Sequence, residues 1–299
     1  MKVVIAPWTE PLRAIGERLD LRIVTAEEAE PRDIATAGFY VPEFSMRIEP
    51  LELLASLPSV SVVQALTAGV EHYLPWLPSG VTLCAGSDIH GTSVAEHAIA
   101  LALADLRGIP EAIADASGGR WNRRVVRGLA DRRVTVIGAG AIGRALVDRL
   151  RPFECEVTVV ARTERPGVVP VAALDDVLRQ SEVVFLCLPA SDATDRLLDA
   201  RRLALLPDSA LVVNVGRGST VDTDALEREL AAGRLRAAVD VIDREPLAAD
   251  DTLWASGAIV TPHIAGNATA FAPRAVRAVV AQLERWATGE PLRNVVVAG

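Results

Sequence analysis

The stretch V-T-V-I-G-A-G-A-I-G, residues 134–143, decides the fold of this chain. Its first four residues form an apolar run rich in β-branched side chains, which is typical of a buried strand. Glycines follow at Gly138, Gly140 and Gly143, where an apolar helical pattern begins. In such a strand–turn–helix unit one glycine permits the turn, one lets the backbone approach a ligand, and one lets the helix pack on its strand. The helix N-terminus then offers N–H groups to phosphates, so the stretch predicts a dinucleotide-binding site.

The composition of the chain argues against several other classes of protein. Its 299 residues suffice for two domains with separate cores. The net charge of −8 and the scatter of the basic residues argue against a nucleic-acid partner. The N-terminal apolar run is too short for a signal peptide, and no run approaches the roughly 18 apolar residues of a membrane span. Cys84, Cys155 and Cys187 lie far apart, which suggests neither disulfides nor a zinc site, so we predict a cytoplasmic protein without a metal.

Short strands and helices alternate along the first third of the chain, which predicts a parallel sheet. We expect strands at 3–6, 21–24, 38–41, 60–63 and 81–84, and helices at 51–57 and from a cap at Thr9 to Leu19. A long helix over 92–106 has the length of a helix that bridges two domains. The following segment, 109–127, is more polar, and we expect it to wrap the surface.

The alternation resumes after the glycine stretch and predicts one doubly wound domain from about 88 to 266. Its further strands are expected at 156–160, 182–188, 210–215, 237–241 and 258–261, with helices near 172–179, 201–206 and 224–232. A final amphipathic helix over 272–288 is expected to end at Gly289. The segment 291–297 could then add a strand back to the first domain, which would make that domain discontinuous.

Three of the predicted strand ends carry reactive side chains: Arg217, Glu245 and His263. The carboxyl ends of the strands in such a sheet face the ligand crevice, so these groups are expected to converge near the nicotinamide. A guanidinium can clamp a carboxylate and polarise the adjacent carbonyl. An imidazole can donate a proton to the carbonyl oxygen as hydride arrives, and a neighbouring carboxylate fixes its tautomer and raises its pKa. Reduction of a 2-keto acid requires such a set.

At these positions the sequence resembles the D-isomer-specific 2-hydroxyacid dehydrogenases, which include glyoxylate/hydroxypyruvate reductases, phosphoglycerate dehydrogenase and D-lactate dehydrogenase. The matching motifs are T-S-V-A-E-H (92–97), G-A-G-A-I-G (138–143), L-C-L-P (186–189) followed by Thr194, N-V-G-R-G (214–218), V-D-V-I-D-R-E-P-L (239–247) and T-P-H-I-A-G (261–266). The resemblance covers nearly the whole chain. It implies an α/β fold of two Rossmann-like, doubly wound parallel-sheet domains with the active site between them, usually as a homodimer. Residues 1–87 plus 267–299 would form the substrate (catalytic) domain, and 88–266 the dinucleotide-binding domain.

The resemblance also implies roles for the reactive residues. Arg217 would bind the substrate carboxyl and carbonyl, His263 would be the acid/base, and Glu245 would be its partner. Asp240, inside a predicted strand, would hold the nicotinamide carboxamide, with the Val215 backbone nearby.

Other implied contacts come from the motifs and from one loop of the first domain. The loop L-T-A-G-V, residues 66–70, is similar to the substrate-carboxylate loop of the family, so Ala68 and Gly69 would bind the carboxylate through backbone N–H groups. The remaining cofactor contacts implied by the motifs are Gly138, Gly140, Ala141, Ile142, Gly143, Leu188, Pro189, Thr194 and Gly266.

One departure from the family pattern concerns the choice of cofactor. NAD-preferring members end the second cofactor-domain strand with an acidic residue that binds the ribose hydroxyls. Nineteen residues beyond Gly143 this chain has Arg162, followed by Thr163 and, two residues later, Arg165. These side chains suit a 2′-phosphate, so we favour NADP(H) over NAD(H). Glu164 could still serve the ribose, because arginine is common throughout the chain.

Two other functions stay open at this point. One is a non-catalytic, NAD(P)H-sensing interaction protein on the same fold, against which the joint presence of Arg217, Glu245 and His263 weighs. The other, a formate-type dehydrogenase, fits poorly because that group is expected to have glutamine at the position of Glu245. The substrate side chain cannot be read from the sequence: Tyr40, Val41, Phe44, Met46 and Arg47 are candidates for its pocket without a pattern that ranks them.

The other histidines and the tryptophans are expected to have structural roles. His97 is expected to pack or to make an interdomain hydrogen bond, and His72 and His90 to lie on the surface or in loops. Trp76, Trp121, Trp254 and Trp286 are expected to pack.

Overall fold

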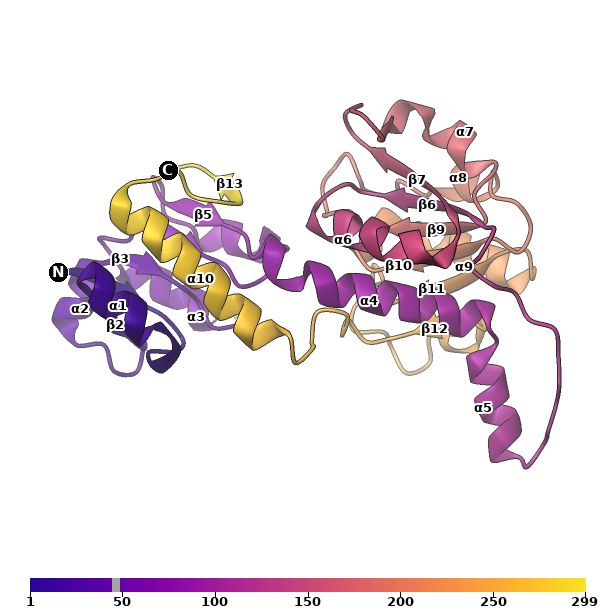
Figure 1. The fold of residues 1–299 in the computed structure, drawn as a ribbon, viewed down its shortest axis with the longest axis horizontal. Coiled ribbons are helices and arrows are strands. Elements are labelled where there is room, and N and C mark those ends of the chain that lie inside the picture. The colour runs from indigo at the N-terminus through magenta and orange to yellow at the C-terminus, as the bar shows by residue number, and fades with distance from the viewer. Residues whose placement is uncertain (45–48) are drawn as a thin grey trace. The chain divides into compact units, whose positions relative to one another are not determined.

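The computed structural model describes residues 1–44 and 49–299, which form two compact units (Figure 1). Unit 1 is Met1–His90 with Thr269–Gly299, and unit 2 is Gly91–Ala268. Met46 and Arg47, named above as candidate pocket residues, lie outside the described residues. Among the described residues, no helix combines the length and the apolar character needed to cross a bilayer.

Unit 1 contains a six-stranded sheet of order β13-β5-β4-β3-β1-β2. The strands are β1 (Lys2–Ile5), β2 (Leu21–Val24), β3 (Ala37–Tyr40), β4 (Val62–Gln64), β5 (Thr82–Cys84) and β13 (Val295–Val297). All neighbours pair in parallel except β13, which pairs antiparallel with β5. The last strand therefore returns to the first sheet, and the expected discontinuous α/β domain is confirmed.

Successive residues of a strand point to opposite faces of the sheet, and here both faces are apolar, so helices cover both of them. Val3 and Ile5 belong to one core cluster, and Val4 between them belongs to the other. The second cluster contains Val279 and Leu283 of α10, which packs on that face. The helices of unit 1 are α1 (Arg13–Leu19), α2 (Pro31–Thr36), α3 (Glu49–Glu52) and α10 (Phe271–Thr288), with 3₁₀ turns at Glu10–Leu12, Leu53–Ser56 and Glu71–Trp76.

Two helix starts in unit 1 differ from the prediction. Thr9 makes no side-chain cap, and the first turn, Glu10–Leu12, is a 3₁₀ turn that leads into α1. The helix α2 was not predicted, although Glu30 and Asp33 form a capping box around Pro31 at the first helical position. The C-terminus of α10 does follow the prediction, since Gly289 adopts a left-handed conformation there.

Unit 2 contains a seven-stranded, all-parallel sheet of order β12-β11-β10-β9-β6-β7-β8. The strands are β6 (Arg133–Ile137), β7 (Glu156–Ala161), β8 (Val169–Pro170), β9 (Val183–Leu186), β10 (Leu211–Asn214), β11 (Arg236–Val239) and β12 (Ile259–Val260). The chain leaves β6 toward β7 and β8, then returns to the other side of β6 at β9. The predicted doubly wound sheet is thus confirmed, with its topological switch point between β6 and β9.

The helices of unit 2 are α5 (Ile109–Ser117), α6 (Ala141–Leu150), α7 (Leu174–Leu178), α8 (Ala200–Leu203), α9 (Thr223–Ala231) and most of α4 (Ser87–Leu106). Three expectations need correction here. The helix α4 begins at Ser87, five residues before its predicted start, and Asp240 lies just beyond the end of β11. The segment after Gly108, expected to be a polar wrap, begins with the helix α5, which extends away from the sheet of unit 2 (Figure 1).

Candidate active site

The glycine turn between β6 and α6 has the three properties predicted for it. Gly138 has a φ of +114°, and a Cβ there would lie 2.6 Å from the carbonyl oxygen of Cys187. A Cβ on Gly143 would lie 1.8 Å from the carbonyl oxygen of Gly138, so the helix packs directly on the turn. Around Gly140, the N-cap of α6, a Cβ would meet no atom within 4 Å, and no side chain caps the helix. The turn therefore leaves open space and uncapped N–H groups where a pyrophosphate would bind.

Glycines also bring together the turns that follow the neighbouring strands. A Cβ on Gly216 would lie 2.7 Å from the backbone nitrogen of Leu188, and one on Gly218 would lie 1.8 Å from the carbonyl carbon of Ile242. Arg217 stands between these two glycines, immediately after β10. The backbone around Arg217 is thus packed between the turns that follow β9 and β11.

Glu245 and His263 form a hydrogen-bonded pair. The Nδ1 of His263 lies 2.7 Å from Oε2 of Glu245, and Oε1 of Glu245 accepts the backbone N–H of Ile242 at 3.0 Å. Glu245 is therefore oriented by the turn that follows β11 while it holds one imidazole nitrogen. Nε2 of His263 is left as the nitrogen that can exchange a proton with a ligand.

The charges in this cluster shift the pKa values of both groups. The bond from Glu245 raises the pKa of His263 above its ordinary value of 6.5, although partial burial and the Arg217 guanidinium act in the opposite direction. Burial alone would raise the pKa of Glu245, but the bonds from His263 and from the Ile242 N–H, together with the nearby Arg217, bring it below its ordinary value. Arg217 is therefore close enough to act electrostatically on the pair, and the three predicted catalytic residues lie in one cluster.

Asp240 supports the turn that carries His263. Its side chain is 1% exposed and accepts three hydrogen bonds: from the Thr261 hydroxyl at 2.6 Å, the Ile264 N–H at 2.9 Å and the Ala265 N–H at 2.9 Å. Its backbone carbonyl accepts the N–H of His263 at 2.9 Å. His263 has a φ of +52°, a conformation that costs about 1–3 kcal/mol in a non-glycine residue and persists only where the surroundings enforce it. The bonds to Asp240 provide that enforcement.

The residues expected at the adenosine end follow β7. Arg162 and Thr163 are exposed directly after the last residue of β7, Ala161. Arg165 donates from Nη2 to the carbonyl oxygen of Ala139 at 3.1 Å, and Nη1 of Arg144 donates to the same oxygen at 3.1 Å. Ala139 belongs to the glycine turn, so Arg165 and Arg144 place two guanidinium groups beside it.

Four other predicted cofactor contacts lie in the turns next to the glycine turn: Leu188, Pro189, Thr194 and Val215. A Cβ on Gly138 would come within 3.3 Å of Cδ2 of Leu188, which places Leu188 against the glycine turn. Thr194 donates its hydroxyl to the carbonyl oxygen of Pro189 at 2.7 Å and so closes the loop after β9. Val215 is buried directly after β10.

In unit 1, Ala68 and Gly69 lie in the loop between β4 and the 3₁₀ turn Glu71–Trp76, with Gly69 buried and Ala68 partly exposed. The N–H of Gly86 bonds the carbonyl oxygen of Thr67 at 2.7 Å and fixes this loop. His90, expected on the surface or in a loop, is instead buried in α4, with its Nε2 2.8 Å from the carbonyl oxygen of Leu66.

Of the pocket candidates in unit 1, Tyr40 is buried and donates its hydroxyl to the carbonyl oxygen of Pro50 at 2.6 Å. The tryptophans do not all pack as expected. Trp286 contacts Phe39 with ring centroids 5.3 Å apart, but Trp254 is half exposed and Trp121 is fully exposed.

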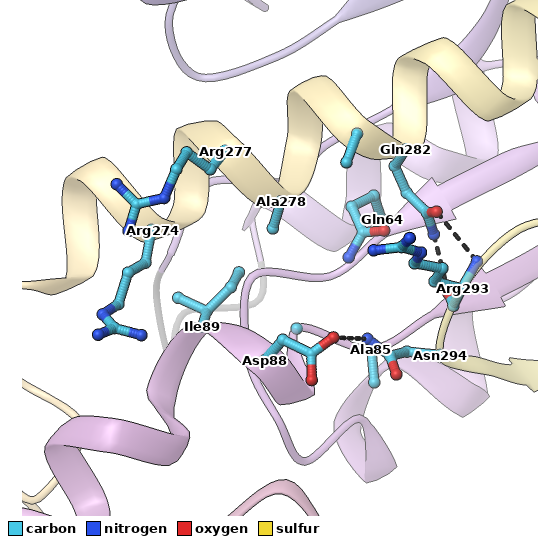
Figure 2. A pocket seen from close by; sticks show the side chains of 12 residues that line it. Gln64, Ala85, Asp88, Ile89, Arg274, Arg277, Ala278, Gln282, Arg293 and Asn294 are labelled. Carbon is cyan, nitrogen blue, oxygen red and sulfur yellow. Dashed lines mark hydrogen bonds between the residues drawn. The ribbon is translucent and has the colours of Figure 1, made fainter.

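Unit 1 also has a cavity of about 230 Å³ beside α10 (Figure 2). Three arginines line it: Arg274 and Arg277 on α10, and Arg293 before β13. Gln282 bonds both the N–H and the carbonyl oxygen of Arg293, as the dashed lines in Figure 2 mark. In Figure 2 the side chains of Arg274 and Arg277 lie at the opposite end of the cavity from Gln282. None of the residues predicted for the active site lines this cavity.

The sequence profile described as "D-isomer specific 2-hydroxyacid dehydrogenase, NAD binding domain" matches residues 99–265, which is more than half of the chain. The chain belongs to this family. The D-3-phosphoglycerate dehydrogenase of Archaeoglobus fulgidus is 34% identical to it in an alignment that covers 99% of this chain and 59% of that protein. The chain spans 43% to 59% of the length of the curated phosphoglycerate dehydrogenases that it matches.

Solved structures of the D-2-hydroxyacid dehydrogenase family match along nearly the whole chain. A family member from Xanthobacter autotrophicus Py2, solved with NADPH and MES, is 30% identical with a TM-score of 0.82, covering 99% of this chain and 98% of that one. An NADPH-dependent glyoxylate/hydroxypyruvate reductase from Sinorhizobium meliloti, solved with NADP and sulfate, is 26% identical with a TM-score of 0.83 and the same coverage. The chain is thus an oxidoreductase of the NAD(P)-dependent 2-hydroxyacid dehydrogenase family.

Sequence reasoning missed some residues that shape this dehydrogenase-family site. The Ile242 N–H orients Glu245, and Thr261 bonds Asp240. No spacing rule marks either contact. The close approaches at Gly216 and Gly218 were also missed, although glycines on both sides of Arg217 are the pattern expected where two backbones meet.

Proposed function

We propose that the protein catalyses reversible hydride transfer between a nicotinamide cofactor and a 2-keto or 2-hydroxy acid, of the D-isomer in the hydroxy form. The observation that carries this proposal is the His263–Glu245 pair, 2.7 Å between Nδ1 and Oε2, in a cluster with Arg217. The cluster lies at the carboxyl ends of β10, β11 and β12, in the same sheet as the glycine turn that follows β6. A bound nicotinamide supplies or accepts the hydride at the substrate carbon.

Each residue of the cluster has one task in this proposal. Arg217 binds the substrate carboxylate and polarises the adjacent carbonyl through N–H donation. His263 donates a proton from Nε2 to the carbonyl oxygen in reduction and removes it in oxidation. Glu245 holds Nδ1, so the imidazole keeps its orientation and its charged form is favoured. The hydride and the proton together convert the carbonyl to the alcohol, so the reaction needs no water molecule as a reactant.

Further contacts are proposed for the cofactor and the substrate. Asp240 and the Val215 backbone bind the nicotinamide side of the cofactor, and the glycine turn binds its pyrophosphate at the N-terminus of α6. In unit 1, the backbone N–H groups of Ala68 and Gly69 bind a substrate carboxylate. The proposed partners are thus two small molecules, the cofactor and the substrate. The proposed location is cytoplasmic, and the three cysteines are free thiols.

Replacement of His263 by alanine tests the reaction. We expect turnover to fall by at least about 100-fold, the low end of what general acid catalysis contributes. The assay follows oxidation of NADPH and NADH with glyoxylate, hydroxypyruvate, pyruvate and bulkier keto acids. Cofactor binding of the variant, followed by fluorescence, should stay within a few-fold of wild type and shows that the variant is folded. Undiminished turnover in H263A would remove His263 from the chemistry.

We also propose that NADP(H) is preferred over NAD(H). The support is the pair of guanidinium groups on Arg162 and Arg165 after β7, where Arg165 already reaches the carbonyl of Ala139 in the glycine turn. Guanidinium groups bind a phosphate bidentately, whereas an acidic residue at the same place would repel the phosphate. Two solved relatives carry NADPH or NADP in their crystals.

Arg162→Ala/Arg165→Ala tests this preference. We expect the double variant to bind NADPH at least about 10-fold more weakly, because each lost charged hydrogen bond contributes about 1.5–3 kcal/mol. Binding of NADH should change much less. Arg151→Ala, an exposed arginine at the far end of α6, is the control. Tighter binding of NADH than of NADPH by the wild type would refute the preference.

The alternative is a cofactor-sensing protein without turnover on the same fold. The complete set of Arg217, Glu245 and His263 weighs against it, since binding of a dinucleotide alone needs none of the three. Bound cofactor without turnover across the whole keto-acid panel would favour it.

A further inference from the structure

His97 contacts the turn that carries His263. His97 lies on α4, and its Nε2 is 3.0 Å from the hydroxyl oxygen of Thr261 and 3.4 Å from Oδ1 of Asp240. His97 was expected either to pack or to make an interdomain hydrogen bond; all three residues belong to unit 2, so the bond that it makes lies within one unit. The contact joins α4 to the chain just after β12.

The protons in this contact can be assigned from the distances. The Thr261 hydroxyl has one proton, and its 2.6 Å distance to Oδ1 of Asp240 requires that the proton lie between them, because two bare acceptors would repel each other. The Thr261 oxygen therefore faces His97 with a lone pair. Nε2 of His97 must carry a proton and donate it. His97 is thus the donor at the start of a chain that runs through Thr261 to Asp240.

The chain of bonds ends at the backbone of the reactive histidine. Asp240 accepts from the N–H groups of Ile264 and Ala265, and its backbone carbonyl accepts from His263. These bonds hold His263 at a φ of +52°, in a region that most non-glycine residues avoid. Without the hydrogen bond from His97 to Thr261, the turn could relax toward ordinary backbone angles. The imidazole of His263 would then move away from Glu245.

We propose that His97 is a positioning residue, which orients His263 by donating to Thr261 and so fixing the Asp240-bound turn. This rests on the proposed function, in which His263 is the acid/base. His97 acts through the turn and needs no contact with the substrate. Its effect should therefore fall on the proton-transfer step and leave the binding of the carboxylate by Arg217 unchanged.

Kinetics of three variants separate positioning from packing. His97→Ala should lower kcat by about 10- to 100-fold, as a displacement of about 1 Å does, and leave the KM for the keto acid within about 3-fold. His97→Gln, whose amide can donate from nearly the same place as Nε2, should recover most of the rate. Thr261→Val should resemble His97→Ala, and the double variant His97→Ala/Thr261→Val should be no slower than either single one. Glu96→Gln, the exposed neighbour on α4, should match wild type.

Titration of the four histidines by NMR gives a readout that needs no turnover. In His97→Ala the pKa of His263 should move toward its ordinary value, because the bond to Glu245 loosens; in His97→Gln it should not. If wild type turned over no keto acid, the proposed function would fail, and this titration would still decide the role of His97. The proposal is overturned if His97→Ala lowers only the melting temperature, with kcat and the His263 titration unchanged. It is equally overturned if His97→Gln is as impaired as His97→Ala.

Discussion

The pair of His263 and Glu245 links the proposed reaction to pH. Its side chains are 44% and 37% exposed, so solvent screens the interaction and its effect on stability is small. Because the pKa of His263 is raised, its stabilising contribution is complete below about 6.5 and is lost as the pH rises through the folded-state value. Because the pKa of Glu245 is lowered, its contribution is complete above about 4.5 and is lost as the pH falls through the folded-state value. The pair is therefore fully formed between these limits.

The same shift predicts the pH dependence of keto-acid reduction. In the proposed reaction the protonated imidazole is the proton donor, so the reductive rate should fall as the pH rises through the raised pKa of His263. Glu245→Gln keeps an acceptor but removes the charge, and we expect the midpoint to move to lower pH by about one unit or more. The measurement is kcat/KM against pH for both proteins, with saturating cofactor. An unmoved midpoint would show that Glu245 does not set the titration of His263.

The sequence singled out Arg217, Glu245 and His263 as catalytic candidates because each follows a strand in the same parallel sheet. It misplaced Asp240 inside a strand, since the residues around it, V-D-V-I, are as apolar as those of β11 itself. Two of the three hydrogen bonds that the Asp240 carboxylate accepts come from backbone N–H groups 24 and 25 residues later in the chain. A backbone N–H is present at nearly every residue, so no residue type reveals that contact.

At the scale of elements, β6, the glycine turn and α6 form the best-predicted part of the fold. Gly140, the N-cap of α6, and Gly143, inside its first turn, make different demands on their surroundings, and their alanine variants separate folding from binding. Gly143→Ala would place a Cβ 1.8 Å from the carbonyl oxygen of Gly138, and overpacking of this kind costs about 1–3 kcal/mol or more. We expect a fall in melting temperature of about 5 °C or more, measured by calorimetry.

Gly140→Ala is the matched control for that experiment. Its Cβ would meet no protein atom within 4 Å, so the melting temperature should stay within about 2 °C of wild type. The added methyl group would nevertheless occupy the space where the pyrophosphate is proposed to approach the backbone, and we expect cofactor affinity to fall at least about 10-fold. Equal stability of the two variants, or unimpaired cofactor binding by Gly140→Ala, would contradict this division of tasks.

The helix α5 was missed for a physical reason. A helix is usually recognised in a sequence by the apolar stripe that it packs against the core. No residue of α5 is buried, so α5 packs no such stripe. One carboxylate of α5 holds the segment that follows the helix: Asp115 accepts hydrogen bonds from the side chains of Arg120, Asn122 and Arg124. We define α5 with the segment 118–128 as the arm. The arm is ordered by its own polar contacts, which leave its apolar side chains pointing outward.

At the scale of the whole molecule, the arm supports the expected homodimer as a proposal. Ile113 is 62% exposed, and Trp121 and Val125 are fully exposed. Large apolar side chains gathered on one projecting segment are uncommon in monomers. A second copy of the chain presents the same surface, so two arms can cover each other in an isologous contact.

Sedimentation velocity tests the dimer. At about 10 μM we expect wild type to sediment as a dimer of the 31.8 kDa chain and Trp121→Glu/Val125→Glu to sediment as a monomer, because a buried unpaired carboxylate is costly. Trp254→Glu, at a half-exposed tryptophan outside the arm, should stay dimeric. A monomeric wild type would disprove the proposal, and a dimeric double variant would place the interface elsewhere.

The place of β13 in the first sheet has a consequence for how the chain is made. Synthesis proceeds from the N-terminus, and domains generally fold as their residues emerge from the ribosome. All of unit 2 has been made once Ala268 has emerged, whereas unit 1 still lacks α10 and β13. Until those elements arrive, the edge of β5 is unpaired and the apolar face that α10 covers is open. The part of the chain that is translated first is therefore the part that is finished last, and during that interval one edge and one apolar face of its sheet are uncovered.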